Sequence, residues 1–499
     1  MKSLSTEQLL KITTLGELKK SGYTSLPIKE ELRKNLIAKL QKRERLFEAI
    51  QAYDETVIPE LERALLSRHN ILLLGLRGQA KTRIARLMTQ LLDEYVPYVL
   101  GSEIHDDPLR PITQETHRLI EEHGDKLPIG WLHRNERYAE KLATPDVSVA
   151  DLIGDVDPIK AANMRLSYSD ERVIHFGLIP RSHRCIFVIN ELPDLQARIQ
   201  VSLFNILQEG DIQIRGFKLR LPLDIQFVFT ANPEDYTNRG SIVTPLKDRI
   251  ESQILTHYPK DVATARQITE QEAKISDPQR SAVQVPSLLM DILEQIAFEA
   301  RSSEFIDQKS GVSARLSISG LENLYSTAER RMILNNETST VARISDLYGV
   351  IPSITGKIEL VYEGEQEGTQ SVAHHLIDRA IRSVFAEQFG NPEKLKRKKE
   401  GSPFAEIQEW FASGNELNLM MDESDAQRKK FISSVVGLES LIKRKFPKAT
   451  GEDKLFLMEM VLHGLAAFSL LTKQGVANNF QFKDMFSSVI SGAIRPEEQ

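Results

Sequence analysis

The sequence predicts an α/β protein in which a parallel sheet lies between helices and is followed by helical domains. Three runs of residues, 70–74, 185–189 and 225–231, are apolar and of strand length, which is typical of strands buried on both faces of a sheet. Helix-compatible sequence follows each run, and alternating strands and helices favour a parallel sheet. After residue 259 the strand signal fades and helical spacing continues, which predicts an α-helical remainder.

The composition is that of a folded globular protein. The chain has 499 residues, of which 41% are hydrophobic and 27% charged. At roughly 100–200 residues per domain, this length allows two to four domains. The 64 basic and 70 acidic residues give a net charge of −6, so no overall positive charge favours binding to nucleic acid. The sequence therefore gives no clear sign of a nucleic-acid partner, although a local basic patch stays open as an alternative.

Cys185 is the only cysteine, so the chain cannot form an internal disulfide or a cysteine-based metal site. Its place at the start of an apolar run predicts a buried, unreactive thiol, and a reducing compartment, the cytoplasm, is expected. The longest apolar stretch, 460–472, is shorter than the ~18–20 residues that a membrane-spanning helix needs. No membrane span is expected.

Four segments are predicted along the chain. In the first, Leu32, Leu36 and Leu40 fall on one face of a helix, which indicates an amphipathic helix laid on a core. The predicted segments are an N-terminal helical extension (1–50), the domain that holds the strands (51–257), a helical domain (258–355) and a helical C-terminal extension (356–499). Within the last, 364–369 is expected to be a loop and 391–403 a solvated basic linker.

The strongest local signal is the segment GLRGQAKT, residues 75–82, directly after the first predicted strand. Small residues let successive backbone N–H groups curl around a phosphate. Lys81 can reach the β- and γ-phosphate oxygens, and the Thr82 hydroxyl can bind magnesium at a helix N-terminus. The segment therefore predicts a phosphate-binding loop, whose contributing residues are Gly75, Arg77, Gly78, Gln79, Ala80, Lys81 and Thr82.

Ala80 departs from the general phosphate-loop pattern, which has glycine at this position. Alanine tolerates a positive φ poorly, so right-handed helical geometry is expected at residue 80.

An amide and a carboxylate, Asn190 and Glu191, end the second predicted strand. An NTPase needs an acid here to hold the water shell of Mg²⁺ and a second acid to activate the attacking water. Glu191 fits the second role. Asn190 is uncharged and can bind a magnesium water only through its amide oxygen. The sequence therefore predicts nucleotide binding more firmly than it predicts hydrolysis.

Three further residues complete the candidate set. Asn232, after the third strand, could orient the attacking water or bind the γ-phosphate, although asparagine before proline is also common in plain turns. Arg249 and Arg315 could each neutralise the negative charge that develops on a γ-phosphate. A lone arginine is usually a surface residue, so these two indicate a catalytic role only in combination with the other candidate residues.

Taken in order, these residues resemble the AAA+ ATPases, and more closely the branch that contains the MoxR-type ATPases and the magnesium chelatase motor subunit. The resemblance covers about residues 50–345. It implies an αβα core with a parallel sheet, followed by a helical lid. By the resemblance, the roles are Walker A loop for residues 75–82, Walker B pair for Asn190 and Glu191, sensor 1 for Asn232, arginine finger for Arg249 and sensor 2 for Arg315.

Two inserts point to the same branch. Residues 147–184 look like the helix-2 insert of this family, and the alternation in 207–217 predicts a β-hairpin before sensor 1. Both inserts would face the pore of a ring or a partner. Residues 105–107 (HDD) are expected to form a polar loop and not a metal site.

The resemblance implies a ring-forming, hexameric ATPase that binds ATP and Mg²⁺ and remodels a protein partner containing a von Willebrand factor A domain. Two alternatives stay open: a nucleotide-gated scaffold with weak hydrolysis, because of Asn190, and the motor subunit of a metal chelatase. The long region after residue 356 disfavours the chelatase motor. A sigma-54 activator is disfavoured because its characteristic loop and a DNA-binding module are absent from the sequence.

Overall fold

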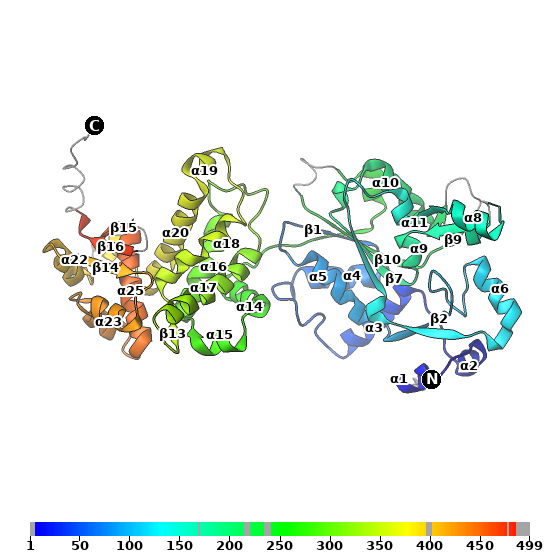
Figure 1. Cartoon of the computed structure of the whole chain (residues 1–499), viewed down its shortest axis with the longest axis horizontal. Coiled ribbons are helices and arrows are strands. Elements are labelled where there is room, and N and C mark those ends of the chain that lie inside the picture. The colour runs from blue at the N-terminus through cyan, green and yellow to red at the C-terminus, as the bar shows by residue number, and fades with distance from the viewer. Residues whose placement is uncertain are drawn as a thin grey trace. The chain divides into compact units, whose positions relative to one another are not determined.

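The computed structural model describes residues 5–167, 170–213, 220–233, 241–395, 402–476 and 479–485. The chain divides into two compact units, Met1–Tyr258 and Pro259–Gln499 (Figure 1). Each unit is described by itself below.

The first unit is built on a five-stranded sheet in the order β11-β1-β10-β7-β4. Every neighbouring pair is parallel, and residues Ile71 and Leu74 of β1 pair with Val228 and Ala231 of β10. The strands are β1 (Ile71–Leu74), β4 (Tyr138–Leu142), β7 (Cys185–Asn190), β10 (Ile225–Ala231) and β11 (Ser252–Leu255). The predicted parallel sheet is confirmed.

Helices cover both faces of this sheet, so its central strands are buried on both sides. Because side chains alternate along a strand, Ile71 and Leu73 pack into one apolar core and Leu72 into another. On the first face lie α3 (Ile28–Gln41), α4 (Val57–Leu66) and α5 (Lys81–Leu87). On the second lie α9 (Leu178–Arg181), α10 (Ala197–Ser202) and α11 (Phe204–Glu209). The continuous apolar character of β7 and β10 follows from this double burial.

The start of the described chain packs beside a small antiparallel pair, β2 (Tyr95–Val99) and β3 (Ile129–His133). The helices α1 (Thr6–Leu10) and α2 (Leu15–Lys20) lie next to it, and the indole N–H of Trp131 donates to the Ile12 carbonyl over 2.9 Å. The helix α6 (Gln114–His123) lies between the two strands in sequence.

Both predicted inserts contain antiparallel strand pairs. In the first, α7 (Val149–Leu152), β5 (Gly154–Val156), α8 (Pro158–Met164) and β6 (Ile174–Phe176) follow one another, and β5 pairs with β6. In the second, β8 (Asp211–Gln213) pairs with β9 (Arg220–Pro222), so an antiparallel pair precedes Asn232 as predicted, but it lies later in the chain than 207–217 because α11 continues to Glu209. Residues 214–219 lie outside the described residues.

The second unit is mainly helical and has one apolar core that includes residues from Ala273 to Phe482. Its helices are α14 (Val262–Glu272), α15 (Asp277–Ala282), α16 (Ser287–Arg301), α17 (Arg315–Leu334), α18 (Ile351–Thr355), α19 (Tyr362–Glu367), α20 (Thr369–Phe389), α21 (Pro392–Leu395), α22 (Ala405–Ala412), α23 (Asp425–Ser433), α24 (Leu438–Lys445) and α25 (Gly451–Ala467). None of the helices in the described residues is long and apolar enough to cross a membrane.

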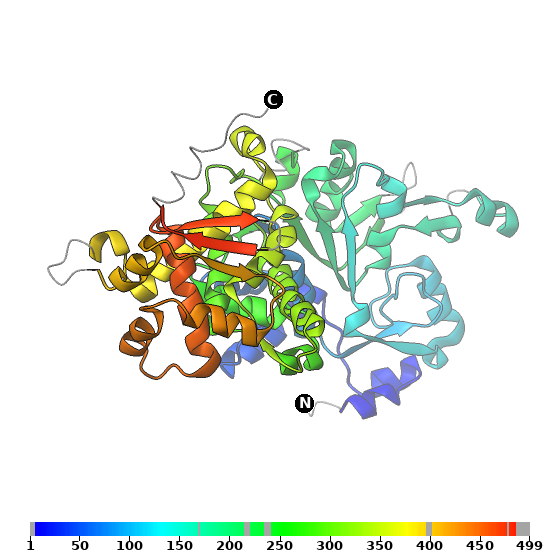
Figure 2. The ribbon, with the colours of Figure 1, turned by 60° about the vertical axis from the view of Figure 1, so that its left-hand side comes forward.

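Two expectations for this unit need correction. The predicted loop 364–369 is wrong, because α19 covers most of it and Gly368, with φ of +84°, separates α19 from α20. The C-terminal region also contains an antiparallel sheet, β14 (Leu417–Met420), β16 (Asn479–Lys483) and β15 (Thr472–Val476), as Figure 2 shows for its two red strands. Of the predicted linker, 396–401 lies outside the described residues.

Buried ion pairs join distant parts of the second unit. Arg331 Nη2 lies 3.0 Å from Asp346 Oδ2, and its Nη1 lies 3.1 Å from Asp425 Oδ1. Arg343 Nη2 lies 2.5 Å from the same Asp425 oxygen. Both arginine side chains are 1% exposed, so Asp425 of α23 pairs with two buried cations, Arg331 of α17 and Arg343, and Asp346 supplies the second negative charge.

Candidate functional site

The candidate residues meet where the three central strands end. Because β1, β10 and β7 are parallel neighbours, their carboxyl ends lie along one edge of the sheet. The loop 75–82 follows β1, Asn190 is the last residue of β7, and Asn232 follows β10. This is the edge at which open α/β sheets bind ligands.

The loop 75–82 turns sharply before α5 begins at Lys81. Gly78 has φ of +75°, and Ala80, the residue before the helix, has φ of +56° and ψ of +15°. The expected right-handed geometry at Ala80 is therefore wrong. Left-handed residues alternating with others point successive N–H groups to one side of the backbone, and that requirement outweighs the roughly 1–2 kcal/mol that an alanine pays for this conformation.

Gly75 is required by its surroundings. A Cβ atom at this position would lie 2.0 Å from Thr256 Oγ1 and 2.2 Å from Gln79 Oε1. The Thr256 hydroxyl donates to Gln79 Oε1 over 2.7 Å, so this buried hydrogen bond occupies the space that a side chain would need. The Gln79 side chain therefore packs toward the end of β11.

Lys81, Asn232 and Glu191 form a continuous hydrogen-bonded chain. The Lys81 ammonium donates to Asn232 Oδ1 over 2.7 Å, to the Leu76 carbonyl over 3.0 Å and to the Gly75 carbonyl. Asn232 Nδ2 donates in turn to Glu191 Oε2 over 2.9 Å. The Lys81 residue is 7% exposed, so its charge lies inside the loop with oxygen atoms around it. The structure thus brings three predicted residues together.

Thr82 and Asn190 form a second contact at the same edge. The Thr82 hydroxyl donates to Asn190 Oδ1 over 3.1 Å. The Thr230 hydroxyl lies 3.2 Å from the same oxygen, and the Glu191 backbone N–H donates to Thr230 Oγ1 over 3.1 Å. Thr230 was not predicted, although a single hydroxyl within the apolar strand 225–231 is the signal that could have indicated it.

Glu191 has a left-handed backbone, with φ of +56° and ψ of +51°. Such a conformation is uncommon for a residue with a side chain and is found more often at functional sites. Here it ends β7 abruptly and turns the carboxylate toward Asn232.

The two predicted arginines are held differently. The Arg249 guanidinium donates to Gln208 Oε1 over 2.8 Å and to the Pro245 carbonyl over 2.7 Å, and it lies 5.0 Å from the centre of the Phe204 ring. These contacts place it against α11 of its own chain. Arg315 is the exposed first residue of α17, in the second unit. The roles of both arginines stay predictions.

Two tyrosines that the sequence did not indicate contact the loop 75–82. The Tyr53 hydroxyl lies 3.0 Å from the Gln79 carbonyl oxygen and 2.8 Å from that of His257. The Tyr258 hydroxyl donates to the Arg77 carbonyl over 2.8 Å. The loop therefore has supports from both the segment before α4 and the segment after β11.

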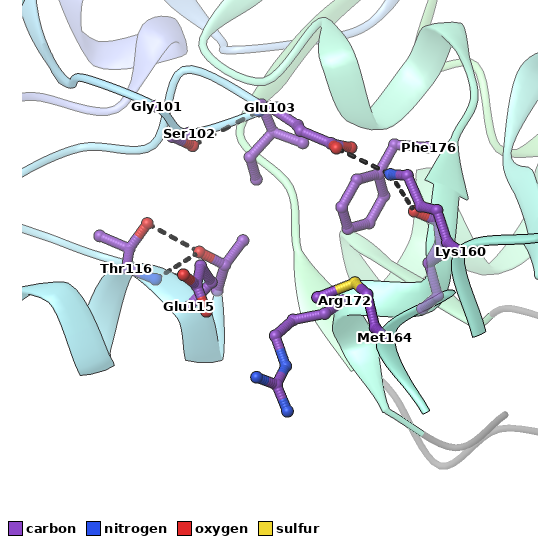
Figure 3. A pocket seen from close by; sticks show the side chains of 12 residues that line it. Gly101, Ser102, Glu103, Glu115, Thr116, Lys160, Met164, Arg172 and Phe176 are labelled. Atoms are coloured by element: carbon purple, nitrogen blue, oxygen red, sulfur yellow. Dashed lines mark hydrogen bonds and ion pairs between the residues drawn. The ribbon is translucent and has the colours of Figure 1, made fainter. Parts of the chain in front are cut away.

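A separate cavity of about 310 Å³ lies between α6 and the first insert (Figure 3). Ile104, Ile174 and Phe176 give it an apolar lining, and Lys160 at its edge donates to Glu103 Oε1 over 2.8 Å. Arg172, also at the edge, pairs with Asp170. The charges around this cavity are thus paired within the chain.

Residues 105–107 were expected to form a polar loop and not a metal site, and Cys185 was expected to be a buried, unreactive thiol. Across the ranges that the structure describes, no group of three or more His, Cys, Asp or Glu residues could hold a metal ion. In the predicted polar loop, the Asp106 carboxylate accepts from the backbone N–H groups of Ile112 and Thr113. Cys185 is 3% exposed, and burial raises the pKa of its thiol to about 11, which fits an unreactive core residue.

No protein-family model matches the chain. Among solved structures, a candidate ATPase from Cytophaga hutchinsonii is 16% identical, with a TM-score of 0.31, over 72% of this chain and 97% of that one. NtrX from Brucella abortus in complex with ADP is 12% identical, with a TM-score of 0.38, over 76% and 73%. The complex between subunits BchI and BchD of magnesium chelatase is 18% identical, with a TM-score of 0.31, over 69% and 99%.

Proposed function

We propose that this protein is an AAA+ ATPase that binds ATP with Mg²⁺ and hydrolyses it to ADP and phosphate. The observation that carries the proposal is the hydrogen-bonded chain from Lys81 through Asn232 to Glu191, at the carboxyl edge of the sheet. It joins a cation for phosphate oxygens to a carboxylate that can accept a proton from water.

Each of these three hydrogen-bonded residues has a distinct task. Bound phosphate would draw the Lys81 ammonium from the carbonyls of the loop to the β- and γ-oxygens. Asn232, released from Lys81, would orient the attacking water, and Glu191 Oε2 would accept its proton. Because Asn232 also donates to Glu191, the carboxylate is held in place before water attacks.

The oxygen atoms of Thr82 and Asn190 suit Mg²⁺ that is also held by nucleotide phosphates. Magnesium prefers oxygen ligands and keeps several waters, so one or two protein groups beside the phosphates suffice. The Thr82 hydroxyl and Asn190 Oδ1 are 3.1 Å apart at the start of α5. Bound there, the ion would neutralise charge on the phosphates.

The assembly and partner follow from the resemblance to the MoxR and chelatase branch. We propose a ring of copies of this chain, six in number, in which Arg249 reaches the nucleotide of the neighbouring copy and Arg315 acts from the lid. In this structure the Arg249 side chain contacts α11 of its own chain, so it would have to leave Gln208 to reach a neighbouring nucleotide. The proposed substrate is a protein with a von Willebrand factor A domain, which the motor remodels or activates.

The deciding experiment is steady-state ATP hydrolysis by the purified chain, with light scattering on the ATP-loaded sample. Lys81→Ala and Glu191→Gln should both abolish turnover, whereas the exposed-site controls Lys126→Ala and Glu121→Gln should not. Turnover in a ring-sized particle that both site variants lose would support the motor. Turnover that survives both variants would contradict it.

A nucleotide-gated scaffold is the second candidate, and Asn190 favours it. With an amide at this position, the site lacks the negative charge that usually holds the magnesium water shell. Nucleotide-dependent assembly without turnover, followed by a large gain of turnover in Asn190→Asp, would support the scaffold.

A further inference from the structure

Two tyrosine hydroxyls hold carbonyl groups of the loop 75–82 from outside. Tyr53, 4% exposed, lies before α4 and shares its one proton between the carbonyls of Gln79 and His257. Tyr258, the last residue of the first unit, donates to the carbonyl of Arg77. The two held carbonyls belong to the peptides that precede Gly78 and Ala80.

A planar trans peptide points its C=O and N–H in opposite directions. A hydroxyl that holds the Arg77 carbonyl outward therefore points the Gly78 N–H inward, and the bond to the Gln79 carbonyl does the same for the Ala80 N–H. Within the described parts of the chain, these two N–H groups have no hydrogen-bond acceptor. They belong to the two residues of the loop with positive φ.

We propose that Tyr53 and Tyr258 are positioning residues that fix the N–H groups of Ala80 and Gly78 for binding a nucleoside diphosphate or triphosphate. This inference rests on the proposed nucleotide site and adds two residues that lie outside its phosphate-loop motif. The tyrosines do not touch the phosphate, and they act through the peptides that they hold.

The Tyr53 side chain is itself held in place by its neighbours. The Tyr53 ring packs edge-on against the His257 ring, with centroids 5.0 Å apart. His257 Nε2 lies 2.8 Å from the hydroxyl of Thr56, the residue that precedes α4. Burial raises the pKa of the Tyr53 phenol above its ordinary value, so the hydroxyl keeps its proton and stays a donor. Tyr53 and His257 thus connect the phosphate loop to the segment that follows β11 and to the residue that precedes α4.

Removing one hydroxyl should weaken phosphate binding and leave nucleoside binding unchanged. A net hydrogen bond contributes about 0.5–1.5 kcal/mol, so Tyr53→Phe and Tyr258→Phe should each raise the Kd of ADP about three- to tenfold. The Kd of adenosine, which lacks phosphate, should stay the same. Tyr98→Phe is the matched control, because the Tyr98 hydroxyl has no hydrogen bond in the described ranges.

The experiment is calorimetric titration of the full chain and the three variants with ADP and with adenosine. A lower ratio of ADP to adenosine affinity in Tyr53→Phe and Tyr258→Phe, with the wild-type ratio in Tyr98→Phe, would support the inference. An unchanged ratio, or an equal loss for both ligands, would overturn it and leave the proposed function standing. If the wild type bound neither ligand, both this inference and the proposed function would be contradicted. Tyr258 is only half-buried, so its variant keeps the test decisive if Tyr53→Phe does not fold.

Discussion

The side-chain oxygen of Asn190 accepts a hydrogen bond from the Thr82 hydroxyl over 3.1 Å, and neither group carries a charge. The oxygens proposed to hold Mg²⁺ are therefore both neutral. We expect Asn190→Asp to lower the Mg²⁺ concentration needed for half-maximal ATP binding about tenfold, because it adds a negative charge at one of the two groups that would hold the ion. A magnesium titration of ATP binding measures this.

Asn205→Asp, at an exposed position of α11, is the matched control for the added charge and should leave the magnesium requirement unchanged. The same two variants should be compared in turnover. A large gain in Asn190→Asp alone would favour the scaffold, and no gain would mean that the amide suffices for hydrolysis.

Glu191→Gln should reduce turnover about 10²- to 10⁴-fold, since the amide cannot accept a proton from water. Glutamine keeps an oxygen for the hydrogen bond from Asn232 Nδ2, so ADP binding should stay within about threefold of wild type. Single-turnover hydrolysis and ADP titration measure the two effects. A variant that hydrolyses ATP at half the wild-type rate would exclude Glu191 as the base.

Ala80→Gly should stabilise the chain by up to about 1 kcal/mol, because glycine adopts a φ of +56° without steric cost. The gain is partly offset by the greater freedom of glycine in the unfolded chain. Ala38→Gly, at an exposed position within α3, should instead destabilise by about 1 kcal/mol. Thermal unfolding of both variants checks the opposite signs; two losses of equal size would contradict the left-handed geometry of Ala80.

Arg249→Ala should lower turnover about 10³-fold and leave the Kd of ADP unchanged, if the guanidinium acts on the nucleotide of a neighbouring copy. The exposed Arg220→Ala serves as a control for loss of an arginine. Mixing Arg249→Ala with Glu191→Gln should restore part of the turnover, because some mixed interfaces combine an intact arginine with an intact carboxylate. No restoration at any mixing ratio would argue against action between copies.

The stability of the second unit should depend on pH through Glu423. Burial raises the pKa of this carboxyl from 4.5 to about 7, against the opposing effects of Arg343, the hydrogen bond with the Met420 backbone and Arg428. Because the folded pKa is above the unfolded one, the carboxyl stabilises the fold fully at pH below about 4.5. That contribution is lost as the pH rises through 7, by ~1–3 kcal/mol.

Glu423→Gln should remove this part of the pH dependence. The midpoint of thermal unfolding of wild type should fall between pH 5.5 and 8.5 by more than that of Glu423→Gln. The exposed Glu387→Gln should behave as wild type. Equal slopes for all three proteins would show that Glu423 does not titrate in this range.

The sequence predicted what depends on local pattern. The strand 225–231 was expected at its observed bounds, and the helical character of the chain after residue 259 was expected too, because double burial and helical spacing leave regular apolar patterns. Lys81, Thr82, Asn190, Glu191 and Asn232 were predicted to act together, and the parallel order of the strands brings them to one edge.

What the sequence did not predict depends on contacts between distant segments. The backbone conformation of Ala80 was predicted wrongly, because the prediction used only the preference of alanine for a negative φ. It did not consider that the loop needs to point its N–H groups to one side. Tyr53 and Tyr258 are 205 positions apart and meet only through the loop that they both contact. The strands β14 and β16 pair across about 60 residues, and neither has a local signal strong enough to mark it as a strand.

The buried arginines of the second unit also limit how this chain can be shortened, in the laboratory or in evolution. Cutting it after Thr355 would remove Asp425, so Arg343 would lose its ion pair and Arg331 would keep only Asp346 as a partner. Removing one partner of a buried ion pair costs roughly 3–5 kcal/mol, so the loss falls mainly on Arg343. A relative that lacks the C-terminal region would therefore be expected to lack Arg343 as well, whereas Arg331 could stay paired with Asp346. We therefore expect the Arg343 guanidinium and the C-terminal region that supplies its carboxylate to be kept or lost together in evolution.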